Sequence, residues 1–142
     1  MSRAAVYNDF ADPERCCFVI IKPDAHQLGV ATEIVEAIER ANLRVHGPQT
    51  LVLDAELVRQ VWPQIVAWTG RTITYMGSGA STVLLAEGPS ATSIMLGLKR
   101  AFRAKYPDPN PVVSVMHTSD CASELRDGLR LFWPHLLEDA VR

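Results

Sequence analysis

The sequence carries little net charge, because its 14 lysines and arginines nearly balance 16 aspartates and glutamates across 142 residues. The formal charge of −2 gives no overall attraction to a polyanion, so binding to a nucleic-acid duplex is disfavoured unless the fold gathers a local basic patch. Cysteines are also few. Cys16, Cys17 and Cys121 cannot build a disulfide framework, and no pair has the CxxC spacing typical of zinc sites. Reduced thiols and a cytoplasmic location fit this cysteine usage.

Long hydrophobic runs are missing as well. No run approaches the length of about 18 apolar residues that indicates a membrane span. The first residues, MSRAAVYNDFADPER, lack the apolar segment of a secretory signal. The sequence therefore predicts neither membrane insertion nor export.

The chain does have enough apolar residues for one hydrophobic core, at 48% of its composition. No linker, repeat or low-complexity segment divides it. We therefore expect residues 1–142 to form a single domain, with residues 1–14 as a loose N-terminal extension.

Hydrophobic periodicity alternates between strand-like and helix-like segments along the chain. Apolar, β-branched residues predict strands at residues 16–21, 81–86 and 111–116, and a further extended segment at 43–53 that is interrupted by Gly47 and Pro48. Helical spacing predicts a helix from Ala31 that Asn42 closes, followed by helices at 55–68, 94–102 and 125–133. Short strands separated by helical crossovers indicate an α/β sandwich, with helices packed on one face of a small, mostly antiparallel four-stranded sheet. A ferredoxin-like arrangement is the candidate.

His117 stands where a predicted strand meets a predicted helix, and it precedes the polar run Thr118, Ser119 and Asp120. Ser119 or Asp120 could cap the following helix. Free amides at a helix N-terminus attract anions, and a neutral imidazole is nucleophilic near pH 7, so this position suits phosphoryl transfer. A histidine that simply ends a strand is the alternative that the local sequence leaves open.

Lys22 ends the first predicted strand, and Pro23 then turns the chain out of the sheet. An ammonium group at this position could neutralise phosphate oxygens, although many lysines at strand ends are merely solvated. Asp24 is expected to stabilise the turn through an Asx-type hydrogen bond.

Two motifs together resemble one family. The segment FVIIKPDA at residues 18–25 looks like the opening strand and lysine signature of the nucleoside diphosphate kinases, and SVMHTSD at residues 114–120 is similar to their histidine signature. The likeness extends from Arg15 to about Asp139. Further segments in the family's order are YMGSG at 75–79, EG at 87–88, MLG at 95–97 and LFWP at 131–134.

The resemblance implies a nucleoside diphosphate kinase-like domain with a ping-pong reaction. The γ-phosphate of a nucleoside triphosphate would move to His117 and then to a nucleoside diphosphate, with Mg²⁺ held by the nucleotide phosphates rather than by protein ligands. Lys22 would neutralise phosphate, and Ser119 would organise the histidine loop. Trp62 falls at the position of the family tyrosine beside the histidine, where it keeps a ring but lacks the hydroxyl.

Several family residues are replaced. Ser114 takes the place of the family asparagine, Ser93 that of an arginine, and Gly128 that of the glutamate that orients the histidine, so Glu124 or Asp127 would have to act instead. The segment before His117 is shorter than usual, which weakens the trimer contacts of the family hexamer and leads us to expect a homodimer. Residues expected to contact the nucleotide in place of the lost groups are Lys99, Arg100, Arg103 and Lys105 for phosphate and Trp68 for the base.

These departures keep other functions open. The leading hypothesis is an active phosphotransferase, with activity that is reduced or specialised for an unusual acceptor. A non-catalytic nucleotide-binding or regulatory relative is the second hypothesis, and a partner-binding module that retains only the fold is the third.

Overall fold

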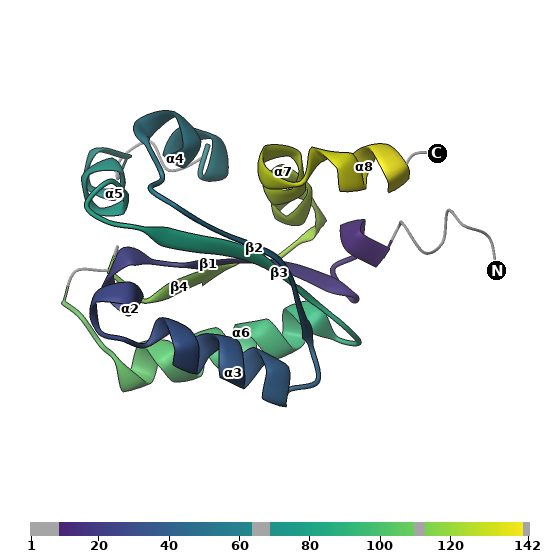
Figure 1. The fold of residues 1–142 in the computed structure, drawn as a ribbon, viewed down its shortest axis with the longest axis horizontal. Helices are drawn as coiled ribbons and strands as arrows, with labels where there is room; N and C mark the ends of the chain where they lie inside the picture. Colours follow the sequence, from purple (N-terminus) through teal and green to yellow (C-terminus); the bar gives the residue numbers. More distant parts are fainter. Residues whose placement is uncertain (1–8, 64–68, 110–112, 141–142) are drawn as a thin grey trace.

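The computed structural model describes residues 9–63, 69–109 and 113–140. Its centre is one four-stranded antiparallel sheet in the order β2-β3-β1-β4 (Figure 1). The strands are β1 (Cys16–Ile21), β2 (Arg44–Leu51), β3 (Ser81–Glu87) and β4 (Met116–Thr118). The first three agree with the predicted strands, and the ferredoxin-like sandwich is confirmed.

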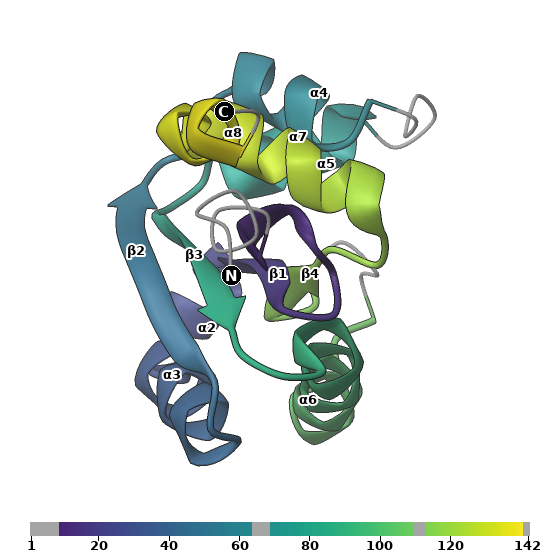
Figure 2. The ribbon, with the colours of Figure 1, turned by 90° about the vertical axis from the view of Figure 1, so that its right-hand side faces the viewer.

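Helices cover both faces of this sheet, which corrects the expectation that they would pack on one face. Figures 1 and 2 show α3 (Ala31–Arg40) and α6 (Ala91–Lys105) on one side of the sheet. On the other side lie α4 (Ala55–Val61), α5 (Thr69–Met76), α7 (Ala122–Phe132) and α8 (Pro134–Ala140). The short helix α2 (Pro23–Gln27) follows β1 directly.

The β1 sequence CCFVII explains the two cores, because alternate side chains of a strand point to opposite faces. Cys17, Val19 and Ile21 pack in the core under α3 and α6, whereas Phe18 and Ile20 pack in the core under α7. All six residues of β1 are buried. A strand covered on both faces reads as a continuous apolar run, so the run CCFVII is itself consistent with helices on both faces of the sheet.

The irregular point predicted in the second strand is present. The β2–β3 register shifts between His46 and Gln49, and Gly47 adopts a left-handed φ of 57°. A side chain at Gly47 would also collide with the ring of Trp133, whose Nε1–H donates a hydrogen bond of 3.1 Å to the Gly47 carbonyl. This position therefore requires glycine for conformation and for space.

Three predicted boundaries were wrong. The helix expected at 55–68 ends at Val61, before Pro63, and residues 64–68 lie outside the described residues. Of the strand expected at 111–116, residues 111–112 lie outside the described residues, and β4 begins at Met116, so His117 sits inside β4 rather than after it. At the N-terminus, the 3₁₀ turn η1 (Asp9–Ala11) packs against α7 and α8, so the loose extension does not include it.

Candidate active site

The pairing of β1 with β4 brings the two sequence motifs together. The strands are antiparallel, with Ile20 opposite His117 and Ile21 opposite Met116. The residue after β1, Lys22, therefore lies beside the residues just before β4, and its backbone N–H donates to the Val115 carbonyl at 2.8 Å. Segments more than 90 residues apart in the sequence thus form one site.

His117 is half-buried at the middle of β4, with its ring against Trp62 at the C-terminal end of α4. The two ring centroids are 5.1 Å apart in an edge-on arrangement. Burial lowers the pKa of His117 to about 3, and the charges of Lys22, Lys99 and Arg103 contribute to the same shift. The imidazole is therefore neutral at pH 7 and surrounded by positive charge, as a nucleophile toward a phosphate requires.

Lys22 is almost fully buried, with 7% of its surface exposed. Its Nζ donates to the Ser114 hydroxyl at 3.0 Å and lies 6.0 Å from the centre of the Trp62 ring. Burial lowers the pKa of Lys22 to about 8, and repulsion from Arg103 and Lys99 adds to the shift, while Asp24 opposes it. The ammonium is therefore still mostly charged at pH 7.

The backbone just before His117 is strained. Val115 is fully buried and β-branched, yet it has a φ of 56°. The Met116 N–H donates to the Ser114 carbonyl at 2.6 Å, which closes a three-residue γ-turn around Val115. A conformation of this kind costs on the order of 1–3 kcal/mol and persists only where surrounding contacts hold it.

Asp24 provides one of those contacts, and its role differs from the expected Asx turn. It lies in α2, where its Oδ2 accepts the Val115 N–H at 3.0 Å and its other oxygen accepts the Tyr75 hydroxyl. Burial and the Asp24 carboxylate raise the pKa of Tyr75, so the phenol remains a proton donor. Nothing in the local sequence signals these bonds, because the partners are distant along the chain.

Ser119 joins the end of β4 to β1. Its hydroxyl accepts the Phe18 N–H at 2.9 Å, and its own N–H donates to the Phe18 carbonyl at 2.9 Å. Ser119 does not cap α7, nor does Asp120, because the N-cap is Cys121. The Asp120 N–H instead donates to the Glu124 carboxylate at 2.9 Å.

The basic residues of α6 divide into two groups. Arg103 turns inward and donates from Nη2 to the Met116 carbonyl at 2.9 Å and from Nε to the Ser114 carbonyl at 3.4 Å. Lys99 also faces the site, where its Nζ lies 3.6 Å from the Asp120 carboxylate. Arg100 is exposed, and Lys105 pairs with Glu33 on α3. The structure thus brings Arg103 and Lys99 toward His117 but not Lys105.

Within the described ranges, no group of three or more histidine, cysteine, aspartate or glutamate side chains is arranged to hold a metal ion. No helix in the same part of the chain is long and apolar enough to cross a membrane. Trp68, the residue expected near the base, lies outside the described residues.

Comparison with known proteins decides the family. The family model for nucleoside diphosphate kinase matches residues 15–136, which is most of the chain and includes both motifs. The chain belongs to the nucleoside diphosphate kinase family.

Individual relatives agree with this assignment. The chain is 32% identical over 80 residues to the nucleoside diphosphate kinase of Ignicoccus hospitalis, a stretch that covers 55% of this chain and 54% of that relative. It is 26% identical over 127 residues to the enzyme of Metallosphaera sedula, which covers 82% and 91% of the two chains. The crystal structure of apo nucleoside diphosphate kinase from Encephalitozoon cuniculi has the same fold, with a TM-score of 0.77 at 20% identity over 84% of this chain and 88% of that one.

The predicted family, fold and kinase class of activity are thereby confirmed. The positions that depart from the family pattern can now be located. Ser93 is exposed on α6, and Ser114 accepts a hydrogen bond from Lys22. Gly128 is buried in α7, where an added Cβ would lie 2.5 Å from the Phe18 ring.

The two carboxylates considered as substitutes for the family glutamate have other partners. Glu124 accepts the Asp120 N–H, and Asp127 pairs with Arg130 at 2.9 Å. Among the described residues, the ring of His117 packs edge-on against Trp62, and no hydrogen bond joins it to either carboxylate. The orientation of His117 therefore comes from the strand, the γ-turn and Trp62.

Proposed function

We propose that this nucleoside diphosphate kinase relative moves the γ-phosphate of a nucleoside triphosphate through His117 to a nucleoside diphosphate or a related acceptor. One observation carries this proposal. A neutral imidazole stands among three cationic side chains, Lys22, Lys99 and Arg103, which is an environment suited to a polyanionic phosphate and to nucleophilic attack on it.

In the first half-reaction, the unprotonated ring nitrogen of His117 attacks the γ-phosphorus. A P–N bond forms as the bond between the γ-phosphorus and the bridging oxygen breaks, and the nucleoside diphosphate leaves with the electron pair. In the second half-reaction an acceptor phosphate oxygen attacks the same phosphorus and releases the neutral imidazole. Lys22 and Lys99 neutralise phosphate oxygens, and Ser119 holds the strand that carries the nucleophile.

Magnesium fits this scheme as a companion of the nucleotide. Mg²⁺ prefers oxygen ligands, retains several waters and often binds through substrate phosphates. The phosphates of the nucleotide and water would therefore supply its ligands. When bound, the ion supplies charge neutralisation on the phosphates, while the protein supplies Lys22 and Lys99.

Trp62 is proposed to border the bound nucleotide, because its ring lies between Lys22 and His117. Trp68 is retained as the proposed contact to the base. Arg100, which is exposed on α6, is retained as a proposed phosphate contact from the solvent side.

A reducing, cytoplasmic setting is proposed from the free thiols of Cys16, Cys17 and Cys121.

A second candidate function is a non-catalytic nucleotide sensor. The observation that favours it is the loss of the family glutamate at Gly128, where the Phe18 ring leaves no space for a side chain. Such a protein would bind nucleotides in the same cationic site without forming a phosphoenzyme.

Labelling with γ-labelled ATP and Mg²⁺ tests both candidates. The wild-type protein should become labelled on His117, and the label should transfer to added nucleoside diphosphate. The His117→Ala variant should remain unlabelled, while His135→Ala, which removes an exposed histidine on α8, should label normally. Chelation of Mg²⁺ should suppress labelling. A nucleotide-induced rise in melting temperature without any label would favour the sensor and reject the phosphotransferase.

A further inference from the structure

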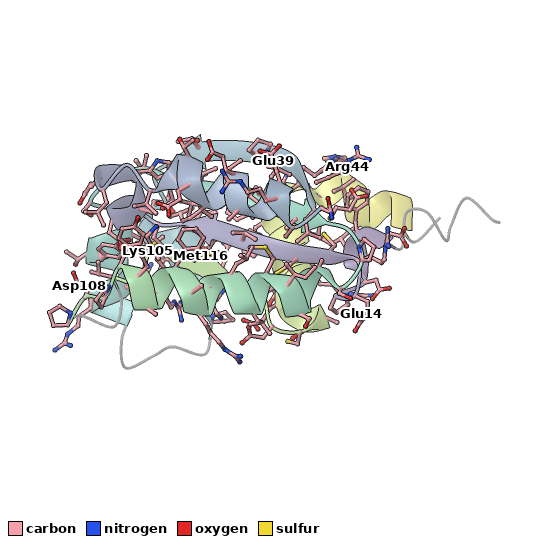
Figure 3. All side chains as sticks on the ribbon, turned by 90° about the horizontal axis from the view of Figure 1, so that it is seen from below. Glu14, Glu39, Arg44, Lys105, Asp108 and Met116 are labelled. Atoms are coloured by element: carbon pink, nitrogen blue, oxygen red, sulfur yellow. The ribbon has the colours of Figure 1, made fainter. Side chains whose placement is uncertain are left out.

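Arg103 bridges the strained turn that precedes His117. Its guanidinium donates to the carbonyls of Ser114 and Met116, the two residues on either side of Val115. Arg103 comes from the C-terminal half of α6, which passes in front of the sheet near Met116 in Figure 3. One side chain thus holds both ends of the γ-turn from the α6 side.

The opposite side of the turn is held by the segment that follows β1. The Lys22 N–H donates to the Val115 carbonyl, and the Asp24 carboxylate accepts the Val115 N–H. Without Arg103, the carbonyls of Ser114 and Met116 would lose the donor that joins them. The γ-turn is therefore held on one side by the segment that follows β1 and on the other side by α6, through Arg103.

His117 depends on this turn because it lies in a short strand at the edge of the sheet, directly after the turn. The strand has three residues and stands at the end of the sheet order, so among the described strands β1 is its sole neighbour. His117 is the second of these three residues, and its position follows from the carbonyl and amide directions set at Val115 and Met116. A change at the turn is therefore transmitted to the ring.

A guanidinium suits this task better than an ammonium. It presents several N–H donors in one rigid plane and can reach two acceptors at once, whereas a lysine is a flexible point charge. These two bonds direct Nε and Nη2 of Arg103 at the backbone rather than at a bound nucleotide. Lys22 and Lys99 already provide positive charge at the site.

We propose that Arg103 is a positioning residue, which holds the γ-turn at Val115 and so aims the ring of His117 at the phosphorus. This inference rests on the proposed role of His117 as the phosphoryl acceptor. It assigns Arg103 to the alignment of the nucleophile and not to nucleotide affinity.

Single-turnover labelling by γ-labelled ATP and equilibrium binding of ADP separate these two roles. In Arg103→Met, which keeps much of the side-chain volume, the labelling rate at saturating ATP should fall by about tenfold or more, while the ADP dissociation constant changes by less than about threefold. Arg103→Lys restores the charge but reaches one carbonyl, so its rate should remain well below wild type. Arg40→Ala, which removes an exposed arginine on α3, should match wild type in both measurements.

Three results would overturn the inference. An unchanged labelling rate in Arg103→Met would do so, as would a loss explained entirely by weaker ADP binding, because that pattern belongs to a phosphate ligand. Full recovery in Arg103→Lys would mean that charge alone matters.

Amide hydrogen exchange tests the contact between Arg103 and the γ-turn without relying on phosphoryl transfer. The Val115 and Met116 amides should exchange faster in Arg103→Met than in wild type, while amides of β3 such as Leu84 should not change. If wild-type protein is not labelled, the proposed function fails, and the exchange of these two amides still decides whether Arg103 holds the γ-turn. Equal exchange in both proteins would reject it.

Discussion

At the scale of single residues, the acid–base properties of His117 and Lys22 predict an unusual pH profile. Burial and neighbouring cations place the pKa of His117 at about 3, far below its ordinary value of 6.5, so the ring stays neutral on acidification. Lys22, with a pKa of about 8, loses its charge on the alkaline side. We expect kcat/KM for ATP, which reports the free protein, to hold down to about pH 5 and to fall above about pH 8.

Steady-state rates across this range in buffers of constant ionic strength provide the measurement. Lys22→Arg is the matched control, because a guanidinium stays charged throughout and should remove the alkaline limb. If kcat/KM instead falls on acidification with a midpoint near the ordinary imidazole pKa, then burial and the neighbouring cations do not lower the pKa of His117.

The residue scale also shows what the sequence could and could not reveal. Lys22 and His117 were found from motifs, because each follows a recognisable apolar segment. The contacts of Asp24 and Arg103 with the turn at Val115 could not be found, since backbone carbonyls and amides carry no sequence identity. The basic face of α6 predicted a charged site, yet only the folded chain distinguishes the inward Arg103 from the exposed Arg100.

At the scale of elements, the close packing of α7 on β1 predicts the effect of a side chain at Gly128. A methyl group there would lie 2.5–2.8 Å from three ring carbons of Phe18, which is itself buried and cannot move aside. Alanine gains about 1 kcal/mol of helix propensity over glycine, but overpacking a core costs about 1–3 kcal/mol. We expect Gly128→Ala to lower the free energy of unfolding in urea, without a change in the m-value.

The matched control is Gly97→Ala on α6. No atom lies within 4 Å of the added methyl group at Gly97, so this substitution should stabilise the protein by about 0.5–1 kcal/mol through helix propensity alone. If Gly128→Ala were stabilising to the same extent, α7 would have to sit farther from Phe18 than the structure places it.

Elements with strong periodicity were predicted well, and short or irregular ones were not. β1, β3 and the helices α3 and α6 carry apolar patterns long enough to identify. The short helices α2, α5 and α8 were missed, because one or two turns give too little pattern. The last strand was placed too early because PVVSVM carries three valines and reads as extended, whereas the γ-turn at Val115 is imposed by contacts from Lys22, Asp24 and Arg103.

At the scale of the whole molecule, we predict a homodimer rather than the hexamer usual in the family. The sequence resemblance implies that the segment between α6 and β4 is shorter than is usual in the family, and on that expectation surface that would join trimers is lost. Light scattering during size-exclusion chromatography should therefore give a mass near twice the chain mass of 15.7 kDa, unchanged by moderate dilution. A stable particle of six chains would mean that the shortened segment is not what holds family trimers together.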